Sequence, residues 1–486
     1  MTRADDLDPD GTRLPIKIDR TSNGEYSPPL LTASQKLARR LAHEAAGDNA
    51  RRLGLSRRAF LVSAAGAAST LAACNRANAG ARGGFFAIDG EAGLDQQRAE
   101  AAVGGDEFIF DVQTHCVEPS GRWAQGPDGE RWARTLRQVF GQASKCTGGG
   151  FDCYSAQTLA REVFLDSDTD AAVVSALWGQ PNPTPVDYAA EAREIIASIG
   201  GEGARAMIHG GVFPQEPGSI EAMDEMARRH RVDAWKLYPQ YGANGRGIFL
   251  DRSDDANRFF ERARALDVKI VAVHKGVPLP GLDYEYSSPR DMGPAAAANP
   301  DLDFLVYHGG FEGGKVEGPY NPDDPQGVDR LIKSHQDAGF RRNRGNLYAE
   351  TGSLWRYFMT RPDQAAHVIG KLLKYFGEER IVWGTDSIWY GSPQDQIQAF
   401  RSFRISDEFQ ERYGYPQLTD AARRRIFGLN GARVYGLDVA ALHGRGALAE
   451  RRAAYRERRN PSFATYGPGT RREFLALWDA RGGRPG

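Results

Sequence analysis

The sequence has little of what three large classes of protein require. Its 486 residues include only four cysteines, too few for a scaffold held together by disulfides. Its 62 basic side chains are balanced by 63 acidic ones, so no basic excess indicates a nucleic-acid partner. The apolar run from Ala59 to Ala73 is shorter than the roughly 20 residues that a membrane-spanning helix needs. The apolar and charged fractions are those of an ordinary globular protein.

The N-terminal part is predicted to lie outside the main fold. Residues 1–55 are rich in Gly, Pro, Asp and Ser at their start, so we expect a disordered extension. Residues 56–80 begin with SRRAFL and continue into an apolar, small-residue stretch, which resembles a twin-arginine export signal. Leu71 to Cys74 resembles a lipobox, which would make Cys74 a lipidated N-terminus that tethers the protein to a membrane; Ala77 to Ala79 is an alternative cleavage site. We therefore expect an exported protein, periplasmic or membrane-tethered; an Ala-rich core helix is the alternative.

Two other cysteines flank a glycine-rich turn. Cys146 and Cys153 stand in KCTGGGFDC and could form a disulfide in an oxidising compartment, or remain free thiols.

From Gly105 onward, short apolar runs alternate with stretches of helical periodicity. Eight strand-like runs are expected, at residues 107–115, 170–178, 204–212, 232–239, 268–276, 303–310, 346–352 and 380–387. Helices are expected at residues 188–198, 219–230, 256–266, 328–338 and 363–376. This alternation predicts an α/β fold, a (β/α)8 TIM barrel over residues 105–440, with a C-terminal helical extension at residues 441–486. A doubly wound open sheet is less favoured because no glycine-rich phosphate turn follows the first strand.

Polar side chains recur at the ends of these strands, where a (β/α)8 barrel carries its chemistry. Asp111, Gln113 and His115 share one face of the first strand if side chains alternate. By the same parity, His274 shares a face with Ile270 and Ala272, His308 with Phe304 and Val306, and Asp386 with Val382 and Gly384. Burying three histidines and an aspartate at one level would cost several kcal/mol without a shared partner. A bound metal, zinc or else iron or manganese, resolves this cost.

These strand ends carry a resemblance to a known family. The Asp-x-x-x-His of strand one, VAVHKG, YHGG, GTDS and the closing IFGLNGARVYGL resemble the amidohydrolase superfamily, in particular its amidohydrolase-related branch. That branch includes aminocarboxymuconate-semialdehyde decarboxylase. The resemblance covers roughly residues 108–437 and implies a metal-dependent TIM-barrel enzyme with one divalent metal.

The resemblance also implies roles for individual residues. His115, His274 and Asp386 would be metal ligands, and His308 would stand near the metal and act as a catalytic residue together with Asp386. Gln113 stands where the family has histidine or glutamate. An amide oxygen is a weaker ligand, so Gln113 is either a weak fourth ligand or the sign of a lost metal.

Three functions stay open at this point. The first is hydrolysis of a small carboxylated, lactone or amide substrate by metal-activated water, with Asp386 taking the proton and His308 stabilising the oxyanion. The second is non-oxidative decarboxylation of an aromatic or unsaturated acid, and the third is a metal-free binding protein. Candidate substrate-binding side chains follow the strands: Lys236, Arg246, Arg290, Trp178 and Trp389. The sequence gives neither the substrate nor the oligomeric state; a homodimer is one option.

Overall fold

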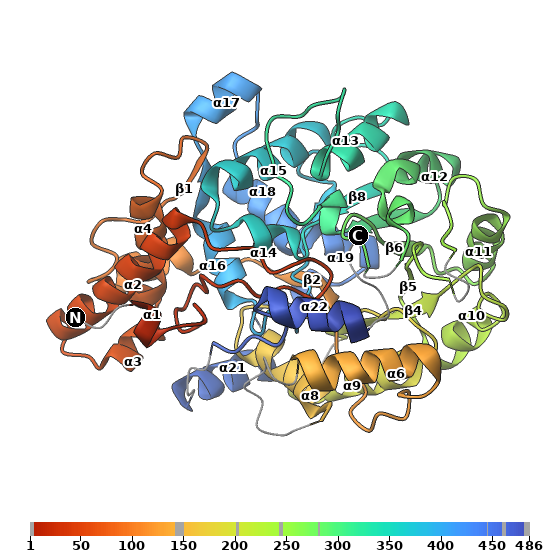
Figure 1. The fold of residues 1–486 in the computed structure, drawn as a ribbon, viewed down its shortest axis with the longest axis horizontal. Helices are drawn as coiled ribbons and strands as arrows, with labels where there is room; N and C mark the ends of the chain where they lie inside the picture. Colours follow the sequence, from red (N-terminus) through yellow and green to blue (C-terminus); the bar gives the residue numbers. More distant parts are fainter. Residues whose placement is uncertain are drawn as a thin grey trace.

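Strands and helices alternate along most of the chain and close into a barrel (Figure 1). The structure, a computed structural model, describes residues 4–140, 150–200, 204–242, 246–279, 282–444, 446–458 and 463–480. The barrel strands are β2 (Phe110–Thr114), β3 (Ala171–Val174), β4 (Ala206–Val212), β5 (Ala234–Leu237), β6 (Ile270–His274), β7 (Asp303–Tyr307), β8 (Leu347–Glu350) and β9 (Ile381–Val382). Each lies within one of the eight runs expected from the sequence.

The eight strands pair in parallel, in chain order from β2 to β9. The last strand meets the first: the Val112 amide donates to the Trp383 carbonyl at 2.9 Å, and the Asp386 amide donates to the Gln113 carbonyl at 2.9 Å. Thr114 and Ser387 form a further parallel bridge. The predicted (β/α)8 barrel is therefore confirmed. A separate two-stranded antiparallel sheet joins β1 (Gly84–Phe86) to β10 (Phe403–Ile405).

Helices surround the strands because each has one apolar stripe that the sheet buries. In α11 (Asp254–Ala265), acidic residues occupy the first turn and Phe259 and Phe260 lie on the buried face. The barrel helices are α6 (Gly126–Arg134), α8 (Ala156–Leu159), α9 (Val186–Gly200), α10 (Met223–Glu225), α11 (Asp254–Ala265), α12 (Met292–Ala298), α13 (Val328–Asp337), α14 (Leu354–Phe358), α15 (Pro362–Tyr375), α16 (Gln394–Ser402), α17 (Asp407–Tyr413), α18 (Asp420–Arg424) and α19 (Asn430–Tyr435). Four of the five helices expected from periodicity appear, as α9, α11, α13 and α15. The fifth, expected over residues 219–230, is only the short α10, continued by a π-helical segment at Met226–His230.

Two apolar clusters show which strand residues face the barrel interior. Leu305 and Tyr307 of β7 belong to the inner cluster, whereas Phe304 and Val306 pack among the surrounding helices. The prediction that Phe304, Val306 and His308 share the inward face is therefore wrong. His308 still reaches the interior because β7 ends at Tyr307 and the chain turns there, with a left-handed φ of +65° at His308.

Strand β2 also departs from simple alternation. Phe110 and Val112 belong to the inner cluster, although the sequence placed them on the face opposite Gln113. The pairing of β2 with β3 shifts between Asp111 and Thr114, and this irregularity lets Gln113 enter the interior as well.

The C-terminal extension both closes the lower end of the barrel and covers its side. Tyr435 at the end of α19 lies edge-on to Phe110 at 5.3 Å, and Leu442 of α20 (Val439–Leu442) joins the inner cluster. Helix α21 (Ala447–Arg458) packs against α9, and α22 (Arg471–Ala480) follows it.

The expectation that residues 1–55 are disordered is wrong for the described part, residues 4–55. Helix α2 (Ala33–Arg52) follows the short α1 (Ala4–Leu7) and begins with a capping box between Thr32 and Gln35. It packs against α4 (Ala64–Ala77). Residues 14–26, called here the N-terminal strap, run across the barrel and bury Leu14, Ile16 and Ile18. These three apolar residues recur at every second position, so an extended strap buries all of them on one side. Their burial holds the strap in place although the surrounding sequence is rich in Gly, Pro and Ser.

The twin-arginine stretch forms two helices beside α2, on one side of the barrel (Figure 1). They are α3 (Arg57–Leu61) and the Ala-rich α4 (Ala64–Ala77), which is followed by α5 (Gln96–Val103). Arg57 donates to the carbonyl of His43 at 3.0 Å, and Cys74 is buried. This is the core-helix alternative, seen in the uncleaved chain; export and lipidation stay predictions. Among the described residues, no helix combines the length and apolarity needed to cross a bilayer.

The cysteines fall into two kinds. Cys153 is disulfide-bonded, whereas Cys74 and Cys116 are free and buried. Cys146, the partner expected from the sequence, lies outside the described residues.

Candidate functional site

The polar strand ends meet at the C-terminal mouth of the barrel in one continuous set of contacts. His115 Nε2 lies 3.2 Å from Asp386 Oδ1, which also lies 3.3 Å from Gln113 Nε2. Gln113 Nε2 lies 3.5 Å from His308 Nε2, and His308 Nε2 lies 3.2 Å from His274 Nδ1. All five residues are at most 2 % exposed. The structure thus brings together every predicted metal ligand and both predicted catalytic residues.

Left-handed backbone holds three residues of this site. His308, Asp386 and Ser353 have φ values of +65°, +59° and +57°, a conformation that side-chain-bearing residues rarely adopt. Each costs of order 1–3 kcal/mol and persists only where the surroundings impose it. The hydroxyl of Ser353 donates to Asp386 Oδ2 at 2.6 Å, so two of the strained residues hold each other.

In each of the three histidines, the ring nitrogen that points away from the cluster (the outer nitrogen) lies at hydrogen-bond distance from a backbone carbonyl. His115 Nδ1 lies 3.0 Å from the Ser175 carbonyl, His274 Nε2 lies 2.7 Å from that of Val277, and His308 Nδ1 lies 3.0 Å from that of Gly352. A neutral imidazole that donates through one nitrogen offers a lone pair at the other. The inner nitrogens of His274 and His308 therefore face each other as acceptors, and the inner nitrogen of His115 faces Asp386.

Burial keeps two of these imidazoles neutral. It lowers the pKa of His274 well below its ordinary value, with the neighbouring His308 adding to the effect. Burial likewise lowers the pKa of His308 to about 4, although the Asp386 carboxylate opposes this. Converging lone pairs on neutral imidazoles, each oriented by a hydrogen bond at the far nitrogen, are the arrangement that metal-binding histidines show.

The Gln113 side chain carries an unsatisfied atom. Its Oε1 is buried and has no hydrogen-bond partner among the described residues, while its Nε2 faces the histidines. Because the oxygen and nitrogen of an amide exchange places by a 180° turn, the same pocket accepts Gln113 with its oxygen toward the cluster. In that orientation Gln113 offers a neutral oxygen ligand, as expected for a weak fourth group.

Further carboxyl groups lie behind the cluster. Glu350 accepts the His308 amide at 2.9 Å, and burial raises the pKa of its carboxyl well above the ordinary value. Asp111 accepts the Thr385 amide at 3.0 Å, and burial raises its pKa to about 7. Buried carboxyl groups beside neutral imidazoles are costly to ionise unless a positive charge lies nearby, so this arrangement favours a cation at the mouth of the barrel.

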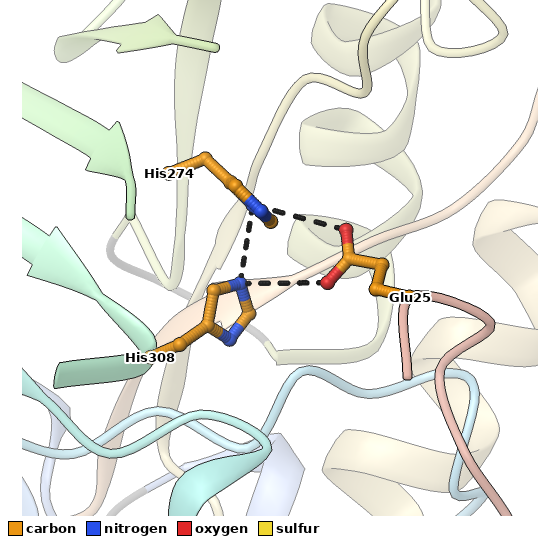
Figure 2. A group of neighbouring side chains, drawn as sticks. All are labelled: Glu25, His274 and His308. Atoms are coloured by element: carbon orange, nitrogen blue, oxygen red, sulfur yellow. Dashed lines mark hydrogen bonds and ion pairs between the residues drawn. The ribbon is translucent and has the colours of Figure 1, made fainter. Parts of the chain in front are cut away.

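The N-terminal strap contributes side chains that the sequence interpretation missed. Asn23 Nδ2 donates to Asp386 Oδ2 at 2.8 Å and to Glu25 Oε2 at 2.5 Å. The Glu25 carboxylate faces His274 and His308 from the side opposite their strands (Figure 2). The only sequence signal was the alternation of Leu14, Ile16 and Ile18 before SNGE, which is typical of an extended segment lying on a surface.

Lys236 lies buried inside the barrel, on strand β5. Its Nζ has no hydrogen-bond partner in the part of the chain that the structure describes. Instead it lies 3.5 Å from the centre of the Tyr307 ring and 4.8 Å from that of Tyr238. Burial lowers the pKa of this amine to about 7, although the Glu25, Glu350 and Asp386 carboxylates oppose the shift.

The other predicted substrate residues fall into two groups. Trp389 stacks on the His115 ring at 6.1 Å and so lines the site, whereas Trp178 packs against Trp132 at 5.2 Å in an aromatic cluster. Arg290 is half-exposed and pairs with Glu285 at 2.9 Å, and Arg246 is exposed. Their role in substrate binding stays a prediction.

Comparisons with solved structures give distant likenesses. An uncharacterised TIM-barrel protein from Bordetella bronchiseptica is 14% identical, with 68% of this chain and 98% of that chain covered and a TM-score of 0.43. The 5-carboxyvanillate decarboxylase of Novosphingobium aromaticivorans, complexed with manganese and a nitrobenzoic acid, has 14% identity, 68% and 96% coverage and a TM-score of 0.43. A dihydroorotase from Campylobacter jejuni has 11% identity, 68% and 84% coverage and a TM-score of 0.35.

A search of curated proteins found no match. A family model does match: the one described as Amidohydrolase covers residues 178–437, more than half of the chain. The matched region contains His274, His308 and Asp386 and ends at Leu437, where the closing helix of the barrel has just finished. This chain therefore belongs to the amidohydrolase family.

Proposed function

We propose that this protein is a metal-dependent hydrolase that cleaves a small carboxylated, lactone or amide substrate at the mouth of its barrel. One observation carries the proposal. Three buried imidazoles, each hydrogen-bonded through its outer nitrogen, converge on one volume: His274 Nδ1 and His308 Nε2 lie 3.2 Å apart, and His115 Nε2 lies 3.2 Å from Asp386 Oδ1. Without a cation these acceptors repel one another, and with one they become its ligands.

The donor set fits a divalent cation. His115, His274 and Asp386 would hold it, with His308 close by and the Gln113 amide oxygen as a weak additional ligand. Imidazole nitrogen with one carboxylate suits zinc first, and iron or manganese when more oxygen ligands join. The unsatisfied Gln113 Oε1 and the two acceptor nitrogens 3.2 Å apart fit a site that takes a divalent cation.

The reaction follows from the groups around the ion. A bound divalent cation supplies Lewis acidity that polarises a carbonyl and acidifies water. Asp386 accepts the proton of the attacking water, because Asn23 and Ser353 already donate to its Oδ2 and keep the carboxylate ionised and oriented. The Gly352 carbonyl behind its ring orients His308, whose unprotonated inner nitrogen can bind the cation or accept a hydrogen bond from the attacking water. Trp389, stacked on His115, helps to exclude bulk water.

Decarboxylation is the second candidate, and Lys236 favours it. An ammonium held over two tyrosine rings with no described hydrogen-bond partner is suited to a substrate carboxylate. A hydrolase with a carboxylated substrate would use Lys236 in the same way, so only the products separate the two reactions.

The test begins with elemental analysis of the purified protein. We expect about one equivalent of zinc, iron or manganese, lost in His274→Ala and retained in the control His230→Ala, a partly exposed histidine outside the mouth. The loaded protein is then offered lactones, amides and hydroxylated aromatic acids, with titration of released acid and of carbon dioxide. A folded protein that holds no metal under any loading condition contradicts both candidate reactions and favours a binding protein.

A further inference from the structure

The N-terminal strap places one acidic side chain directly against the histidines. We infer that Glu25 is itself a ligand of the cation, an inference that rests on the proposed metal site and adds to it a residue from outside the barrel.

The position of the carboxylate carries the inference. Glu25 Oε1 lies 3.8 Å from His274 Nδ1, and its Oε2 lies 3.8 Å from His308 Nε2, so one carboxylate spans both rings (Figure 2). These three groups can each offer an atom within 4.8 Å of the others. The nitrogens that Glu25 faces are the same two that lack a donor between them. A carboxylate and two imidazoles at this spacing form a ligand set for a single divalent cation.

The strap is built to hold Glu25 there. Lys17 Nζ donates to the carbonyls of Tyr390 and Ser392 at 2.6 and 3.1 Å, and Asp19 pairs with the buried Arg356. A buried polar group that loses its partner costs free energy, so any shift of the strap that broke these contacts would be unfavourable. The contacts therefore fix the position of the strap along the barrel.

Nearer the site, the chain turns into the mouth. The Glu25 amide donates to Asn23 Oδ1 at 3.0 Å, and the Gly24 amide donates to Ser22 Oγ at 2.9 Å. Gly24 has a left-handed φ of +89°, which suits glycine at this turn. The Tyr26 hydroxyl meets that of Tyr390 at 2.9 Å. Glu25 therefore projects from a short turn whose two flanks are both anchored to the barrel.

Glu25 also compensates for the neutral ligand position on strand β2. Gln113 brings no charge to the site, and a cation held by imidazoles and Asp386 alone would lack one anionic ligand relative to a glutamate at that position. Asn23 donates to both Asp386 and Glu25, which lets two carboxylates share one small volume. The strap thus supplies, from the N-terminal part of the chain, the negative charge that Gln113 does not bring to the site.

A ligand role for Glu25 bears on whether the N-terminal segment is cleaved from the protein. Cleavage at Cys74, or after Ala79, would remove Glu25 together with the strap. If Glu25 is a ligand, the functional protein retains its N-terminus. The alternative is that the strap only blocks the mouth of the barrel without binding the cation. The experiment below distinguishes this blocking role from a ligand role.

The experiment compares the full-length chain with Glu25→Gln, Glu25→Asp and the control Glu44→Gln, an exposed acid on α2. Glutamine keeps the size of the side chain and an oxygen that accepts from Asn23, so the strap stays seated. Zinc affinity is measured by competition with a chromophoric chelator, and the visible absorption of the cobalt-loaded protein reports the ligand set. Thermal unfolding in excess chelator checks that each variant is folded, and Glu25→Asp keeps the charge should Glu25→Gln fail to fold.

We expect Glu25→Gln to bind zinc at least about 100-fold more weakly, since even residues behind a metal ligand cost 10–100-fold. Its cobalt spectrum should shift, Glu25→Asp should fall between, and Glu44→Gln should match the wild type. Unchanged affinity and spectrum in folded Glu25→Gln overturn the inference and leave the proposed metal site standing. Unchanged affinity with faster turnover also overturns it, in favour of a plug. A folded wild-type protein that binds no cation defeats the proposed function itself.

Discussion

Two buried lysines give a test with effects of opposite sign. Lys236 and Lys275 are both fully buried, but among the described residues only Lys275 has an ion-pair partner, with its Nζ 2.7 Å from Asp291 Oδ1. We expect Lys236→Met to stabilise the protein at neutral pH and to impair its activity. We expect Lys275→Met to destabilise it, because Asp291 would be left as an uncompensated buried charge.

The magnitude for Lys236 follows from its pKa. Burial lowers that pKa from 10.5 to about 7 in the folded protein. The unfolded chain then binds a proton between about pH 7 and 10.5 that the folded protein does not, so stability rises with pH across this window. At pH 7 the cost of burying Lys236 is about 5 kcal/mol, taken as an upper bound. Methionine, with a similar shape and no charge, removes this cost.

The assay is chemical denaturation at pH 7 and pH 9.5 in excess chelator, which keeps metal binding out of the comparison. Lys236→Met should gain several kcal/mol at pH 7 and less at pH 9.5, whereas Lys275→Met should lose about 3–5 kcal/mol. In the loaded enzyme, Lys236→Met should raise KM for a carboxylated substrate more than it lowers kcat. A Lys236→Met protein less stable than the wild type at pH 7 would refute the reasoning, since the ammonium would then have a stabilising partner.

Three further predictions concern the site and the helical layer. Asp386→Asn should lower kcat by about 10²-fold or more at any pH, because its proton-accepting carboxylate is gone; steady-state turnover measures this, and undiminished turnover would remove Asp386 from the mechanism. Gly384→Ala should cost both stability and metal content, since its Cβ would lie 1.7 Å from Glu350 Oε1; elemental analysis and thermal unfolding report the two losses. Burial lowers the pKa of His335 to about 4, so about 3 kcal/mol of stability should be lost as pH falls from 6.5 toward 4. His335→Phe should flatten that pH dependence in denaturation experiments, and an unchanged slope would place its origin elsewhere.

The barrel could be predicted because its signals are local. Each strand is a short apolar run ended by a polar residue, and each helix carries its own periodicity, so the eight strands and the histidines at their ends were identified in the sequence. The parity argument failed at His308 because a left-handed turn, rather than strand alternation, aims its ring. Alternation describes a strand only up to the residue where the strand ends.

The strap could not be predicted in the same way. Its order comes from contacts with residues hundreds of positions away, such as Lys17 with Tyr390 and Thr21 with Thr465, and a local composition rich in Gly, Pro and Ser contains no sign of them. The twin-arginine pattern is a related case. In the structure, Arg57 contacts His43 on α2, a role that the pattern does not distinguish from recognition by an export system. The roles of Asn23 and Glu25 become visible only when the mouth of the barrel is seen in three dimensions.

The two ends of the chain touch each other above the histidines. The Ser22 amide donates to the Pro468 carbonyl at 2.9 Å, and Thr21 meets Thr465 at 3.2 Å across 444 positions of sequence. During synthesis the first of these residues must wait for nearly the whole polypeptide before its partner leaves the ribosome. The mouth is consequently the last part of the molecule to be finished, and a nascent barrel remains open until its own tail arrives to seat the strap.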